Sequence, residues 1–320
     1  MRTDAEEIAN IYLKARKEKL TESKAFLRVK PFLEDRYQQE GLSSLSKEML
    51  ETTNLCCVKA KDAEIFGKGF FKIIAGEGDT LGDDEALLFE KLVERFPNSA
   101  KLAEMLADVY GVIVNETGDE VYTQKLDDLS KNNPALENAA LQRLYALVDI
   151  YYNKDFNLND YIKAIDKAKE IYQQHPKLDF AEYYAGGLSK IVQEQEEEDD
   201  ALKTIELLKE LLHCWNDSFI AAHYLNALSK LTWKQDEKGC LETIQKMESY
   251  WNNWPYKKGT LAMHLAYTLA NYSLCTKGTE REKVLDKIEK LAAYWEPAAE
   301  LAYELAEGTY RYAHKPAKAK

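Results

Sequence analysis

Histidine and cysteine are the residues of this chain best suited to catalysis or metal binding. The sequence has five of each, at positions 175, 213, 223, 264 and 314 for histidine and 56, 57, 214, 240 and 275 for cysteine. Neither His-Glu-x-x-His nor Cys-x-x-Cys occurs, and these are the spacings with which one helix or turn presents two metal ligands. We therefore predict no metal site. The fold could bring His213 and Cys214 close to Cys240, and we interpret these three as helix-end and packing residues.

Two short segments have part of the pattern of a ligand-binding loop. FGKGFF (66–71) contains two glycines, but Lys68 is followed by Gly69 and not by the Ser or Thr of a phosphate-binding loop. NKDFNLNDYIKA (153–164) begins with oxygen ligands like a calcium loop, but Leu158 replaces the glycine of its sharp turn and Ala164 the closing glutamate. We predict no cofactor here, and a polar turn in which Asp160 caps the following helix.

A polar and aromatic stripe is the best candidate for a binding surface. It recurs at i, i+3 and i+7 in three similar segments, a spacing that places residues on one face of a helix. When the segments are superposed, positions 183, 223 and 264 share one level, 186, 226 and 267 a second, and 190, 230 and 271 a third. The predicted partner-binding residues are Tyr183, Lys190, His223, Asn226, Lys230, His264, Tyr267 and Asn271. Rings, amides and some positive charge suit a peptide backbone with acidic side chains.

The segments that carry this stripe belong to a longer internal repeat. LFEKLVERFPNSAKLAEMLADVYGVI (88–113) has two apolar runs of helical period joined at a proline, which cannot donate a backbone hydrogen bond and disfavours helix in the residue before it. Similar phrases recur at steady spacings of 37 to 42 residues, with their junctions at Pro97, Pro134, Pro176, Trp215, Pro255 and Pro297. A single helix pair cannot bury its apolar face, so the repeat predicts stacked pairs with a continuous core.

The repeated phrase resembles the tetratricopeptide (TPR) repeat. The resemblance lies in one helix, its terminal proline and the next helix, with small residues such as Ala164, Ala168 and Ala185 at close helix contacts. It covers roughly residues 84–314, with a spacing longer than the ~34 residues of the standard unit and a degraded first-helix signature. It implies an all-α, right-handed solenoid of antiparallel helix pairs that binds a partner protein or peptide on its concave face.

The regions flanking this array lack the phrase. We expect residues 1–80 to form three or four helices, as an N-terminal helical cap or as degenerate repeats, with Pro31 and Gly41 as punctuation. AGEGDTLGDD (75–84) is the expected break before the array, and residues 315–320 are an expected disordered tail. The acidic run QEQEEEDD (193–200) is interpreted as a solvated turn between two copies, with a docking patch for a basic partner as the alternative.

Charge and cysteine usage narrow the class of protein. The 320 residues carry 43 Lys and Arg against 55 Asp and Glu, a net charge of −12, which argues against nucleic acid and anionic membranes as partners. No apolar run approaches the ~20 residues of a membrane span. The odd number of cysteines, two of them adjacent, predicts five free thiols and a cytoplasmic location.

These observations favour a non-catalytic module that binds a partner peptide or helix, in a scaffold, chaperone-like or immunity (antitoxin-like) role. Two alternatives remain open. The first is an enzyme whose site lies between the N-terminal helices and the array, with His264 or Cys214 meeting a carboxylate from residues 1–80. The second is a helical-repeat binder of single-stranded RNA, which the acidic charge disfavours.

Overall fold

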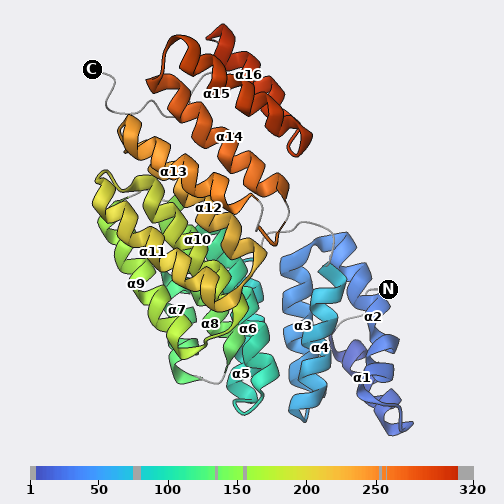
Figure 1. Cartoon of the computed structure of the whole chain (residues 1–320). Coiled ribbons are helices and arrows are strands. Elements are labelled where there is room, and N and C mark those ends of the chain that lie inside the picture. Colours follow the sequence, from blue (N-terminus) through green and yellow to red (C-terminus); the bar gives the residue numbers. More distant parts are fainter. Residues whose placement is uncertain are drawn as a thin grey trace. The chain divides into compact units, whose positions relative to one another are not determined.

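The chain is helical throughout the part that the structure describes. The structure is a computed structural model that describes residues 5–74, 81–133, 136–153, 157–251, 254–256 and 258–308. In these ranges it contains sixteen α-helices, one short 3-10 helix and no strand (Figure 1). The all-α prediction is therefore confirmed. The expected tail at 315–320 and most of the expected break, residues 75–80, lie outside the described residues.

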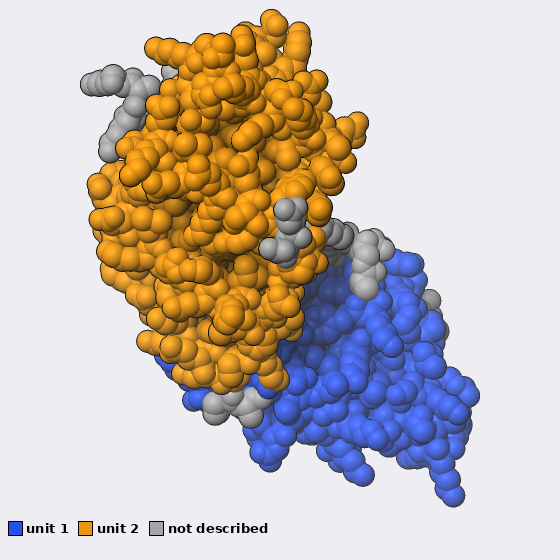
Figure 2. Space-filling view, in the orientation of Figure 1, with its two compact units in different colours: residues 1–154 blue, residues 155–320 orange. Residues whose placement is uncertain are grey.

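The chain divides into two compact units, residues 1–154 and 155–320 (Figure 2). Inside unit 1, α3 packs against α5 and α4 against α6, so helix packing continues from one side of segment 75–84 to the other. The division between the two units falls at 154/155, within the range 84–314 where the repeats were expected. The helices of unit 1 are α1 (Ala5–Lys17), α2 (Glu22–Glu40), α3 (Leu42–Cys56), α4 (Ala60–Ile74), α5 (Asp83–Arg95), α6 (Ala100–Thr117), α7 (Glu120–Asn132) and α8 (Glu137–Asn153).

Unit 2 contains the three segments with the predicted stripe. Its helices are α9 (Leu158–Gln174), α10 (Leu178–Glu194), α11 (Glu198–Trp215), α12 (Ser218–Leu231), α13 (Glu237–Tyr250), α14 (Lys258–Cys275), α15 (Gly278–Lys290), the 3-10 helix η1 (Leu291–Ala293) and α16 (Pro297–Glu307). The even-numbered helices pack against one another in chain order, from α10 through α12 and α14 to α16. Each odd-numbered helix packs on the even-numbered helix that follows it, as α9 does on α10 and α13 on α14.

The junctions predicted from the repeated phrase coincide with helix ends. Pro97, Pro176 and Pro255 each lie between two helices, Trp215 is the last residue of α11, and Pro297 is the first residue of α16. Proline suits these places because its missing N–H costs nothing at the first helical position or outside a helix. The sixth junction, Pro134, lies outside the described residues.

Two local predictions need correction. Pro31 does not punctuate the chain but lies inside α2. Its missing N–H would have bonded the carbonyl of Leu27, and both residues are exposed, so water can take that place. The cap of α9 is Asn157 and not Asp160, because the Asn157 side chain accepts hydrogen bonds from the backbone N–H groups of Asn159 and Asp160.

The glycines of FGKGFF have a packing role in the middle of α4. A Cβ on Gly69 would lie 2.0 Å from the ring of Phe26, and one on Gly67 would lie 2.7 Å from the sulfur of Met105. Phe26 belongs to α2 and Met105 to α6, and these two helices can approach α4 only because positions 67 and 69 carry no side chain. The apolar runs of the repeated phrase are buried, and so are Tyr184 and Tyr224, which are 4% and 1% exposed.

Candidate functional site

The eight residues of the predicted stripe come from three helices that pack side by side. Tyr183 and Lys190 lie on α10, His223, Asn226 and Lys230 on α12, and His264, Tyr267 and Asn271 on α14 (Figure 1). Packing of α12 against both α10 and α14 brings the three helices into one layer of unit 2. We call the side of this layer that carries the stripe residues the even-helix face.

The register between these helices differs from the simple superposition of the three segments. His223 was placed level with Tyr183, but its ring lies over Gly186, where a Cβ would be 3.5 Å from its Cε1 and Nε2 atoms. Asn226 correspondingly donates a hydrogen bond to the hydroxyl of Ser189, at 3.0 Å. Each contact is displaced by three residues along α10, which is roughly one helical turn. Sequence superposition cannot give this displacement, because it depends on how the helices slide against each other.

The two asparagines of the stripe connect neighbouring helices. Asn226 bonds α10, and Asn271 donates to the hydroxyl of Thr232, at 2.8 Å, just beyond the end of α12. Asn271 is only 8% exposed, so this amide is largely satisfied inside the protein. Of the predicted residues, the asparagines therefore contribute to the assembly of the even-helix face as well as lying on it.

The lysines of the face are half-buried beside aromatic and polar groups. The ammonium of Lys230 lies 3.9 Å from the centre of the Trp233 ring, a cation–π contact. Burial lowers the pKa of Lys230, although the nearby carboxylate of Glu194 acts in the opposite direction. Desolvation of this kind disfavours the charged form, and an added negative charge would relieve it.

Lys234 belongs to this group and was missing from the prediction. It is half-buried and donates to the backbone carbonyl of Gln193, at 3.1 Å, and burial lowers its pKa. Glu194 lies near it as it does near Lys230. The signal was present in the sequence, because positions 223, 226, 230 and 234 continue one helical stripe at i, i+3, i+7 and i+11.

The two histidines of the face are more deeply placed than a surface stripe suggests. His264 is only 7% exposed, and burial, followed by the charges of Lys230 and His223, lowers its pKa to about 4. Burial, followed by the charge of Lys190, also lowers the pKa of His223. Both rings are therefore neutral at pH 7, and each can offer one ring N–H donor and one acceptor.

Two aromatic side chains, Tyr267 on α14 and Trp233 just after α12, also belong to this region. Tyr267 is 38% exposed, and its ring centre lies 5.3 Å from that of Trp295, just before α16. Trp233, beneath Lys230, is half-buried. Large rings of this kind, held in place by packing, are the side chains that most often dominate the affinity of protein interfaces.

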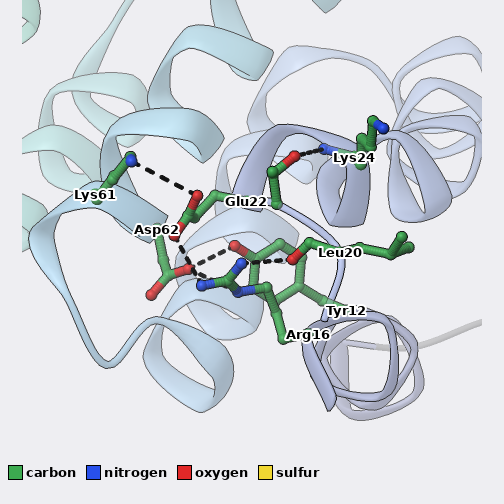
Figure 3. Close-up of polar contacts among 8 residues, drawn as sticks. Tyr12, Arg16, Leu20, Glu22, Lys24, Lys61 and Asp62 are labelled. Carbon is green, nitrogen blue, oxygen red and sulfur yellow. Dashed lines mark hydrogen bonds and ion pairs between the residues drawn. The ribbon is translucent and has the colours of Figure 1, made fainter. Parts of the chain in front are cut away.

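The enzyme alternative requires Cys214 or His264 and a carboxylate from residues 1–80. The structure shows where each of these groups lies. The exposed Cys214 lies on α11, and His264 has cationic groups around it. In residues 1–80, the buried carboxylate of Asp62 accepts a hydrogen bond from Tyr12, at 2.7 Å, and Arg16 lies beside it (Figure 3). This network joins α1 to α4.

A second half of the same network extends to α2. Arg16 also binds the carboxylate of Glu22, at 2.8 Å, and Lys61 lies 3.8 Å from the other oxygen of Glu22 (Figure 3). The pKa of Tyr12 is strongly raised by burial and by its bond to Asp62, so the phenol stays protonated. We interpret the network as a structural connection of three helices. Sequence patterns did not reveal it because its central pair, Tyr12 and Asp62, is 50 residues apart.

Three further observations bear on the class of protein. Among the described residues, no group of three or more His, Cys, Asp or Glu side chains could hold a metal ion. No helix in the described ranges has the length and apolar character needed to cross a bilayer. No protein-family model matches the chain, and no curated protein matches it.

Proposed function

We propose that this chain is a non-catalytic, TPR-like interaction module, a right-handed solenoid of antiparallel helix pairs. It holds an acidic segment of a partner protein on the even-helix face of unit 2. The cytoplasm is its proposed location, and a scaffold, chaperone-like or immunity role its proposed context. The TPR resemblance of the repeated phrase and the packing order of the helices support the architecture.

One observation carries the proposed function. In a chain of net charge −12, Lys190, Lys230 and Lys234 gather half-buried on the even-helix face. Burying a cation costs free energy that an exposed lysine would not incur. An anionic partner would offset that cost. The rest of the surface is acidic and would repel the same partner, so binding would be confined to the even-helix face. The same balance disfavours nucleic acid, whose binding requires an extended basic field.

The proposal is tested by reversing charge on the face. Full-length protein is titrated into a fluorescent ten-residue peptide of alternating Asp and Ser, and binding is measured by anisotropy at low salt. The double variant Lys190→Glu with Lys230→Glu should lose binding. The matched control, Lys203→Glu with Lys209→Glu, changes two exposed lysines of α11 and should retain it.

Two results would contradict this function. One is equal binding of the acidic peptide by the face variant and by the α11 control. The other is equal binding by wild type of an analogous peptide in which Lys replaces Asp. Circular dichroism of each variant checks that the helices are intact, so that lost binding is not lost folding.

A further inference from the structure

The basic residues of the even-helix face form a connected cluster with the two histidines. We define the basic cluster as Lys190, His223, Lys230, Lys234 and His264. Its members lie close enough together for the charge of one to lower the pKa of the next. Lys190 lowers the pKa of His223, and His223 that of His264. Lys230 lowers the pKa of both His264 and Lys234. Side chains of three consecutive even-numbered helices, α10, α12 and α14, thus lie near one another.

The cluster contains donors that the protein does not use. Within the described residues, no hydrogen bond engages the ring of His223 or of His264, and neither ring has a nitrogen among the buried side-chain atoms that lack a partner. Their nitrogens therefore remain open to water or to a ligand, although His264 as a whole is only 7% exposed. The ring of His223 lies against the backbone of α10 at Gly186, where the absence of a side chain leaves it room.

Lysines outnumber the carboxylate in this cluster. Lys190, Lys230 and Lys234 are its cationic side chains, Glu194 lies near Lys230 and Lys234, and both rings are neutral at pH 7. A carboxylate would bring a single negative charge. A phosphoryl group carries about −1.5 to −2 at pH 7 and presents three acceptor oxygens around one atom, which suits several converging donors.

We propose that the basic cluster binds the phosphoryl group of a phosphorylated serine or threonine in the partner's acidic segment. This inference rests on the proposed function and specifies the group that anchors the partner. The lysines neutralise the dianion, and the neutral rings of His223 and His264 donate N–H groups to its oxygens. Binding therefore depends on the phosphorylation state of the partner and would be regulated by it.

The test compares three forms of the acidic peptide whose central residue is serine, phosphoserine or glutamate. We expect the phosphoserine form to bind full-length protein about tenfold or more tightly than the glutamate form, because hydrogen bonds to charged groups are strong. Lys230→Gln should remove most of this preference. Lys203→Gln on α11 should not, since Lys203 is exposed and lies outside the cluster.

The location is tested by NMR of the histidine ring signals at constant ionic strength. N-acetyl-phosphoserine amide should shift the signals of His223 and His264 saturably, and leave that of the exposed His213 unchanged. Inorganic phosphate is included to separate a free anion from a phosphorylated segment. If inorganic phosphate or sulfate shifts the rings as strongly, and the phosphopeptide binds no more tightly than they do, the site holds an adventitious ion only.

The outcomes separate this inference from the proposed function. Equal affinity for the phosphoserine and glutamate peptides would overturn the phosphoryl inference and leave the acidic-peptide function standing. Absence of binding by any acidic peptide would overturn both. Tighter binding of the phosphoserine peptide with no change at either histidine would show that another surface recognises the phosphoryl group, and it too would overturn the assignment.

Discussion

At the scale of single residues, two glycines allow an aromatic or imidazole ring of a neighbouring helix to approach the backbone. Gly69 in α4 admits the ring of Phe26, and Gly186 in α10 leaves room for the ring of His223. The two positions differ in how closely the neighbouring ring approaches. A Cβ would lie 2.0 Å from Phe26 at Gly69, but 3.5 Å from His223 at Gly186, which is an ordinary van der Waals contact.

This difference predicts opposite effects of the same substitution. Gly69→Ala should lower the melting temperature, because overpacking costs about 1–3 kcal/mol and outweighs the helix propensity of about 1 kcal/mol that alanine gains. Gly186→Ala should leave stability unchanged or raise it, since the alanine meets no clash. Thermal unfolding followed by circular dichroism measures both. A stabilised Gly69→Ala protein would show that Phe26 can move aside without cost.

At the scale of elements, side chains from one helix hold the next at a definite register. Asn226 joins α12 to α10, and Asn271 joins α14 to the end of α12. Tyr267 lies one turn from Asn271 on the same helix but is 38% exposed, against 8% for Asn271. Residues of one sequence stripe can therefore serve stability or recognition, and burial decides between these roles.

We expect Asn271→Ala and Tyr267→Ala to separate the two roles. Loss of the Asn271 amide removes its hydrogen bonds to the Thr232 hydroxyl and the Ser229 carbonyl, and a typical hydrogen bond contributes about 0.5–1.5 kcal/mol, so this variant should melt at a lower temperature. Tyr267→Ala should change stability by about 1 kcal/mol or less, because its main contact is the ring of Trp295. It should instead weaken binding of the acidic peptide. Unfolding of Tyr267→Ala would show that this residue belongs to the core.

The helices themselves could be predicted from the sequence, whereas their register could not. A period of 3.6 residues and a proline act locally, so they placed the junctions at Pro97, Pro176 and Pro255. The sliding of α12 against α10 depends on residues 37 apart in the sequence, such as Asn226 and Ser189 or His223 and Gly186. Local periodicity carries no information about such pairs.

The candidate site was predicted in part for the same reason. The i, i+3, i+7 spacing identified the lysines and histidines of the face, because they share one side of each helix. Lys234 continues the same spacing at i+11, but the prediction stopped at i+7, and in the structure Lys234 lies beyond the end of α12 at Leu231. The depth of His264 was missed because burial depends on neighbouring helices and not on the spacing within α14.

At the scale of the whole molecule, the candidate site belongs entirely to one compact unit. The helices α10, α12 and α14, and the odd-numbered helices that pack on them, all lie within residues 155–320. In an array of helix pairs, each pair contacts only its neighbours, and stability is approximately a sum of local terms. Unit 2 therefore contains its own core and every residue of the basic cluster.

We expect a fragment of residues 155–320 to fold without unit 1 and to bind the acidic peptide with nearly the affinity of the full chain. Circular dichroism should show a helical spectrum and a cooperative thermal transition, and anisotropy gives the affinity.

The matched control is a fragment of residues 197–320, which begins in the turn after α10 and lacks Lys190 and Gly186. Without α10, the inner side of α12 is exposed, and Asn226 loses the hydroxyl of Ser189. This shorter fragment should melt at a lower temperature and bind the peptide weakly. Retention of full affinity by residues 197–320 would place the binding surface outside the even-helix face, and an unfolded 155–320 fragment would show that unit 2 depends on unit 1 for its stability.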